Sequence, residues 1–203
     1  AQIHVVPDKA TFTVTIDAAD VDKMRVQQLA QDKMAKVIDN ATRAGIDPSG
    51  LTIASAALAP EYHTDRHGRP LYLQVKRWVA TRNLTLRVDD LGNMNAIFGA
   101  VIEGGGVLQG DIAFDTSRLE EVRAQARLRA AEAAKQKASA LVEALGAKLG
   151  RPTSIGEHDP SYSGPWNYKN AMEDWRSGAF VDGAFSAGSM TVSGHVNVTF
   201  EIT

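Results

Sequence analysis

The chain has 203 residues, of which 44% are hydrophobic and 23% charged, a balance typical of folded globular proteins and not of disordered chains. Its 22 basic and 24 acidic side chains give a net charge of −2, so the sequence offers no general electrostatic attraction to nucleic acid. The sequence contains no cysteine, which excludes disulfides, thiolate catalysis and cysteine-based metal sites.

The first predicted elements are a strand and a helix. Residues 11–16, TFTVTI, alternate threonine with Phe, Val and Ile, which is the period of a strand with one buried face. Asp20 is the expected N-cap of the following helix, and Gly45 and Pro48 supply its stop signals. The apolar residues between these signals recur at helical spacing, which indicates a long amphipathic helix.

A hairpin is predicted next. Residues 51–58 and 71–88 have strand character, and the sequence DRHGRP between them supplies the Gly and Pro of a turn. The apolar residues of the second strand fall into an odd-numbered set, Leu71, Leu73, Val75 and Val79, and an even-numbered set, Trp78, Ala80, Leu84, Leu86 and Val88. One regular strand cannot bury both sets on the same face, so we expect a bulge or a change of packing partner between Lys76 and Arg82.

Two further helices are predicted, with a strand between them. Asp89 or Asp90 is the expected cap of the first helix, which ends at the sequence EGGG. Ser117 and Glu120 have the Ser-x-x-Glu spacing of a capping box and should open the second helix, which is long and rich in alanine. Its expected apolar stripe consists of Leu119, Val122, Ala126, Ala130, Ala134, Ala138, Leu141 and Leu145.

Two strands close the chain. Residues 153–157, TSIGE, predict a short strand, and residues 190–202 alternate apolar and polar side chains over their full length. The last strand should therefore be a long member of an antiparallel sheet with one covered face. Between these strands, at about 159–188, lies a loop excursion.

The complete order of elements is β-α-β-β-α-β-α-β-β. It predicts an α+β fold in a single domain over residues 1–203, with helices packed on one face of a largely antiparallel sheet. The opposite face is rich in Thr, Ser and Asn, which suits solvent and also suits stacking against another subunit.

The loop excursion is unusually aromatic. Residues 161–188 hold two of the three tryptophans and have no clean helical or strand period. The five large aromatic residues that form the candidate interaction surface are Trp166, Tyr168, Trp175, Phe180 and Phe185. Two interpretations stay open: a locally collapsed loop, or a contact surface, because exposed Trp and Tyr are enriched where proteins meet partners.

The sequence contains no recognisable catalytic pattern. His63 and His67 have an i, i+4 spacing, but they fall in the hairpin turn beside Gly68, without a third ligand, so we interpret them as exposed loop residues. The acidic pairs at 89–90 and 120–121 fall at helix starts, where the helix dipole favours negative charge. We therefore predict no catalytic residue, no cofactor and no metal site.

The start of the chain, AQIHVVPDKA, lacks the basic and apolar regions of a signal peptide, and no apolar run reaches the roughly 18 residues of a membrane span. We expect no transmembrane segment. A mature exported protein, from which the signal peptide has been removed, has the same features as a cytoplasmic one, so the composition leaves the compartment open.

Five strings carry a resemblance to a known family: VVPDKATFTVTI, AGIDPSGLTIAS, ATRNLTLRVDDLGNM, the segment from IAFDTSRLEE to RPTSIGE, and MTVSGHVNVTFEI. In their order and spacing, almost from end to end, they resemble the SIMPL-domain family, which includes bacterial periplasmic immunogenic and oxidative-stress-defence proteins. The chain departs from the family pattern at Val6, where a second proline is common, and in the aromatic loop, onto which no functional residue carries over.

The resemblance implies an exported, periplasmic envelope protein without enzymatic activity, with a role in stress defence and a tendency to form homo-oligomers. We expect it to act through self-assembly or through contact with an envelope protein partner. The alternative, from a different class, is a periplasmic protein that binds a small molecule or metal through His63, His67 and the loop aromatics.

Overall fold

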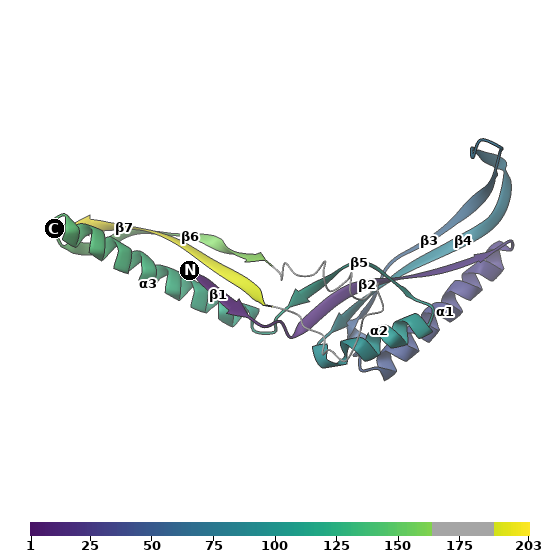
Figure 1. The fold of residues 1–203 in the computed structure, drawn as a ribbon, viewed down its shortest axis with the longest axis horizontal. Coiled ribbons are helices and arrows are strands. Elements are labelled where there is room, and N and C mark those ends of the chain that lie inside the picture. The colour runs from purple at the N-terminus through teal and green to yellow at the C-terminus, as the bar shows by residue number, and fades with distance from the viewer. Residues whose placement is uncertain (164–188) are drawn as a thin grey trace. The chain divides into compact units, whose positions relative to one another are not determined.

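The computed structural model describes residues 1–163 and 189–203 (Figure 1). In chain order its elements are β1 (Gln2–Val5), β2 (Lys9–Asp20), α1 (Lys23–Arg43), β3 (Leu51–Thr64), β4 (Pro70–Val88), α2 (Met94–Glu103), β5 (Val107–Asp115), α3 (Leu119–Ala144), β6 (Leu149–Ser163) and β7 (Met190–Ile202), with 3-10 turns at Pro48–Gly50 and Leu91–Asn93. The α+β class and the predicted order of elements are confirmed, with β1 as an additional short strand.

The described residues form two sheets, whereas the sequence predicted one. The first has the order β3-β4-β2-β5 and the second the order β1-β7-β6. Two compact units contain them: Lys9–Ala113 forms one, and Ala1–Asp8 joins residues 114–163 and 189–203 in the other. Pro7, which has no N–H to donate, lies between β1, which pairs with β7 in one sheet, and β2, which pairs with β4 in the other. A single domain over residues 1–203 stays a prediction.

The unit Lys9–Ala113 places its helices on one face of its sheet. Helix α1 packs on β2 and β4, and α2 packs on α1 (Figure 1). The buried core contains Val14, Ile16, Val26, Val37, Leu84, Leu86, Ile97 and Val101. Phe12 of β2 and Phe98 of α2 meet edge to face, with their ring centroids 5.1 Å apart.

The cap of α1 differs from the prediction. Asp22, not Asp20, is the N-cap, and its carboxylate accepts hydrogen bonds from the backbone N–H groups of Met24 and Arg25 at 2.7 and 3.1 Å. Asp20 accepts instead from the N–H of Asp22 at 2.9 Å, because β2 continues through Asp20. Asp90 caps the 3-10 turn that leads into α2, as one of the two predicted positions.

In the second unit, α3 covers the sheet β1-β7-β6. The predicted alternation of β7 is confirmed in its first residues, where Met190 and Val192 are buried. At Gly194 the strand lies so close to the helix that a Cβ atom would be 2.5 Å from the carbonyl oxygen of Ala126. Strand β6 runs from Leu149 to Ser163, so the strand predicted at 153–157 is longer and extends past residue 159, where the loop excursion was expected to begin.

Two details of α3 also differ from the prediction. Ser117 does not cap the helix: its N–H and Oγ donate hydrogen bonds to the carboxylate of Asp8, at 2.7 and 2.5 Å. The buried stripe advances in steps of four through Val122, Ala126 and Ala130 and reaches Val142, which leaves the predicted members Leu141 and Leu145 exposed. Within the described parts of the chain, no helix is long and apolar enough to cross a membrane.

Candidate interaction surface

The most prominent exposed feature is the outer part of the β3–β4 hairpin, residues 61–77, which we call the hairpin arm. Strand β4 pairs with β2 from Val88 to Trp78, where β2 ends at Asp20. Beyond Trp78 the two hairpin strands pair only with each other, and Figure 1 shows them bending away from β2 and α1. Within residues 1–163 and 189–203, the outer backbone edges of the arm therefore have no strand partner.

A tight turn closes the arm. The carboxylate of Asp65 accepts hydrogen bonds from the N–H groups of His67 and Arg69, at 2.8 and 3.0 Å, and the N–H of Asp65 donates to the carbonyl of Arg69 at 2.9 Å. Gly68 has a φ of 78°, a conformation that glycine adopts without a steric cost. Aspartate and glycine in this order thus explain why the chain reverses here.

A bulge lies at the base of the arm, at Lys76. This residue is one end of the region, Lys76 to Arg82, in which the sequence predicted a bulge or a change of packing partner. Glu61 pairs with Arg77 and the next residue, Tyr62, pairs with Val75, so Lys76 is the extra residue. Lys76 and Arg77 both donate to the carboxylate of Glu61, at 2.9 and 2.5 Å. These two hydrogen bonds, from Lys76 first, hold the pKa of Glu61 below its ordinary value.

The bulge also separates three members of the odd-numbered apolar set, Leu71, Leu73 and Val75, from the even-numbered set, whereas the fourth member, Val79, lies on the side of the even-numbered set and is half-buried. The even-numbered set faces the core, with Ala80, Leu84, Leu86 and Val88 buried and Trp78 half-buried. In the arm, the side chains of Leu71, Leu73 and Val75 are 36%, 100% and 45% exposed. Tyr72 contacts Tyr62 edge to face, with ring centroids 5.2 Å apart. The arm therefore presents apolar side chains beside open strand edges, which is an arrangement that folded proteins usually avoid.

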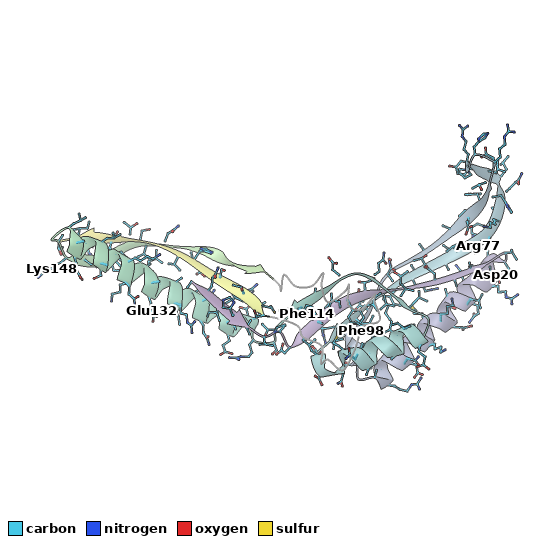
Figure 2. The ribbon with its side chains drawn as sticks, in the orientation of Figure 1. Asp20, Arg77, Phe98, Phe114, Glu132 and Lys148 are labelled. Carbon is cyan, nitrogen blue, oxygen red and sulfur yellow. The ribbon has the colours of Figure 1, made fainter. Side chains whose placement is uncertain are left out.

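The arm is basic in a chain of net charge −2. Residues 61–77 contain four Lys or Arg and two Asp or Glu. Lys76 and Arg77 share the carboxylate of Glu61, whereas Arg66 donates to the ring of His67. In Figure 2 the side chains at the outer end of the arm point away from the rest of its unit. The arm thus offers positive charge together with apolar surface.

The structure places His63 and His67 in the arm and leaves both exposed. The Nε2 atom of His67 accepts a hydrogen bond from Nε of Arg66 at 3.1 Å, so a fixed positive charge adjoins the ring. Among the side chains that the structure describes, those of residues 1–157 and 189–203, no group of three or more His, Cys, Asp or Glu is arranged to hold a metal ion. A cationic neighbour disfavours a metal cation at His67.

The other predicted surface lies outside the described residues. Trp166, Tyr168, Trp175, Phe180 and Phe185 belong to residues 164–188, so their role stays a prediction. The arm itself was not among the predicted interaction residues. Its signal in the sequence was the odd-numbered apolar set at 71–75, which one regular strand could not bury on the same face as the even-numbered set.

Comparison with known proteins identifies the family. The family model described as SIMPL, protein of unknown function (DUF541), matches residues 1–200. The chain is 26% identical over 158 residues to the uncharacterized protein YggE of Edwardsiella ictaluri, a match that covers 78% of this chain and 65%, less than two thirds, of that protein. It is 26% identical over 201 residues to the 26 kDa periplasmic immunogenic proteins of Brucella melitensis and Brucella abortus, covering 97% of this chain and 79% of each relative. The chain therefore belongs to the SIMPL family.

Proposed function

We propose that this protein is an exported, periplasmic protein without enzymatic activity that assembles with further copies of itself through the hairpin arm. The observation that carries the proposal is Leu73, a leucine whose side chain is fully exposed on a strand with an open edge. Burying one leucine side chain contributes about 2 kcal/mol, so leaving it in water favours association.

A second copy of the chain is the occupant that fits the arm best. Two arms that pair edge to edge would satisfy their free backbone N–H and C=O groups and bury Leu71, Leu73 and Val75 of both copies. Such a contact uses the same surface twice, which is the usual geometry of a two-fold dimer. The charges of Lys76 and Arg77 are neutralised in part by Glu61 at the base of the arm, which limits repulsion between the copies.

The periplasmic location is supported by the name of the two Brucella relatives, which are periplasmic immunogenic proteins. A stress-defence role follows from the family resemblance alone. It can be tested by comparing the peroxide sensitivity of cells with and without the gene. Equal survival would remove this part of the proposal and leave the assembly part standing.

Sedimentation velocity over a wide range of concentrations tests the assembly. We expect the chain to associate and the variant Leu73→Asn to shift towards monomer. Leu128→Asn is the matched control, because Leu128 is also an exposed leucine, at 67%, but lies on α3. A strict monomer at all concentrations would refute self-assembly, and equal effects of the two substitutions would refute the arm as its site.

A further variant separates the arm from the aromatic loop. Replacing residues 161–187 by a short Gly/Ser linker removes the predicted aromatic surface and leaves the arm intact. Assembly that survives this replacement and is lost in Leu73→Asn supports the arm. The opposite result assigns assembly to the loop and contradicts the proposal for the arm.

A further inference from the structure

A small pocket lies in the unit Lys9–Ala113, away from the hairpin arm and independent of the proposed assembly. Its volume is about 130 Å³, and its lining residues are Gln27, Ala56, Ala57, Leu58, Ala80 and Arg82. Gln27 belongs to α1, whereas the other residues belong to β3 and β4. The pocket therefore forms where α1, which packs on β2 and β4, leaves the outer strand β3 uncovered.

Arg82 is the unusual member of this lining. It pairs with Ile16 of β2 on one side and with Ala56 of β3 on the other. Ala80 and Leu84, two residues before and after it, are buried, so Arg82 occupies the helix-facing side of the sheet. A charged side chain in such a position is normally paired with an opposite charge.

No carboxylate pairs with Arg82 among the side chains described, which are those of residues 1–157 and 189–203, and its Nε atom is buried without a hydrogen-bond partner among them. Two other arginines of β4 differ in this respect. Arg77 contacts Glu61 at 2.5 Å, and Arg87 contacts Asp89 at 3.4 Å. Arg82 is half-buried, and its Nε atom is thus a buried donor without an acceptor among the described residues.

The rest of the lining defines what anion would fit. Alanine at positions 56, 57 and 80 leaves the space open, and Leu58 adds an apolar wall. Gln27 supplies one amide that can donate or accept. A volume of about 130 Å³ is well below the roughly 300 Å³ at which sites for drug-sized ligands begin, so the pocket suits a small molecule.

These features lead us to infer that the Arg82 pocket binds a short-chain monocarboxylic acid, of which butyrate is a suitable probe. One guanidinium matches one carboxylate, and the alanine and leucine walls match a short aliphatic chain. Inorganic phosphate fits less well, because it carries more charge and needs several donors, whereas only Gln27 adds a polar side chain to the lining.

A carboxylate can come from a free acid or from a glutamate side chain of a peptide. The proposal is the free acid, because a pocket of about 130 Å³ is filled by such a molecule alone. N-acetylglutamate N-methylamide presents the same carboxylate on a peptide backbone and serves as the second probe. Tighter binding of this compound than of butyrate would overturn the assignment to a free acid.

The test is a titration of the full chain with sodium butyrate up to about 20 mM, followed by the NMR shifts of backbone amides and compared with sodium chloride at equal ionic strength. A ligand this small should bind with a dissociation constant on the order of 1 mM. We expect saturable shifts centred on residues 56–58 and 80–82. Butanamide, which has the same shape without the charge, should bind at least about tenfold more weakly.

Three variants make the result specific. Arg82→Gln removes the charge and Ala56→Leu fills the pocket with Arg82 in place, so each should weaken binding at least about tenfold. Arg87→Gln is the control, because Arg87 lies on the same strand but outside the pocket lining. Shifts that do not saturate, that sodium chloride reproduces, or that persist unchanged in both Arg82→Gln and Ala56→Leu would overturn the proposal.

Discussion

The close approach of β7 to α3 at Gly194 gives a quantitative prediction for the substitution Gly194→Ala. The added Cβ would lie 2.5 Å from the carbonyl oxygen, 2.6 Å from the carbonyl carbon of Ala126, and 3.0 Å from the nitrogen of Arg127. Ordinary contacts begin at 3.4 Å, so the helix must move by about 0.9 Å at this point. All three atoms belong to the helix backbone, and no side chain can rotate to make room.

The expected loss of stability follows from this displacement. A gap of about 0.5 to 1 Å forfeits a quarter to a half of the dispersion energy of each contact that it opens. Val122, Ala126 and Ala130 form the buried stripe of α3 on either side of the contact. Overpacking of this kind costs about 1 to 3 kcal/mol, and we expect a value near about 3 kcal/mol because only backbone atoms are involved.

Urea unfolding combined with hydrogen exchange measures the effect. A loss of about 3 kcal/mol should lower the urea midpoint of this unit by about 1 to 3 M, and the amides of α3 and β7 should lose protection first. Gly156→Ala is the matched control in the same sheet, because its Cβ would meet its nearest atom, the carbonyl oxygen of Asn197, at 4.0 Å.

A second substitution distinguishes backbone from side-chain contact. Ala126→Gly removes the side chain of Ala126 but leaves its carbonyl group in place. The methyl group that Gly194→Ala adds would still contact this carbonyl group in the double variant. Ala126→Gly should therefore not restore the stability that Gly194→Ala removes. Full stability of Gly194→Ala, or its rescue by Ala126→Gly, would refute the reasoning.

Three further predictions concern the unit Lys9–Ala113. The lowered pKa of Glu61 means that its interaction with Lys76 and Arg77 stabilises the arm above the ordinary carboxyl pKa and is lost as the pH falls through the lowered value. Amide protection factors in the arm, in which the intrinsic pH dependence of exchange is removed, should therefore fall on acidification, and Glu61→Gln should abolish this fall. Asp22→Ala should lower the thermal midpoint more than Asp20→Ala, because Asp22 caps α1; equal midpoints would contradict this cap. Gly99→Ala should stabilise the protein by up to about 1 kcal/mol in urea unfolding, because Gly99 is exposed in α2 with open space around its Cβ position, and a loss of stability would count against that environment.

The sequence predicted those features that depend on residues close together in the chain. The alternation of 190–202 and the two apolar sets of β4 reflect which side of a strand is buried, and the structure confirms the beginning of the first pattern and the even-numbered set of the second. The bulge at Lys76 follows from the same argument, because two incompatible sets require an extra residue between them.

The sequence could not predict partners that are distant in the chain. Ser117 has the spacing of a cap, but its hydroxyl instead meets Asp8, which lies 109 positions earlier. Residues 2–5 become a strand only because β7 pairs with them. Likewise, the exposed arm depends on where β2 ends relative to β4, which is a matter of register and not of composition. The sequence therefore indicated the candidate surface only through three apolar residues, Leu71, Leu73 and Val75, that could not be assigned to the core.

The pairing of β1 with β7 joins an early and a late segment of the chain in one unit, which we call the frame. The other unit, the contiguous segment Lys9–Ala113, lies between these two segments in the sequence. Closing a loop of around 100 residues costs about 4 to 5 kcal/mol in chain entropy. Asp8 and Asp115 flank the inserted segment, and the N–H of Asp8 donates to the carbonyl of Asp115 at 3.1 Å. If the inserted segment has already folded, it holds Asp8 and Asp115 close together, and most of the entropy cost of closing the loop is removed. We expect Lys9–Ala113 to fold first and the frame to close only after the last strand is available, an order that hydrogen exchange during refolding would show as protection of β2 and α1 before β1 and β7.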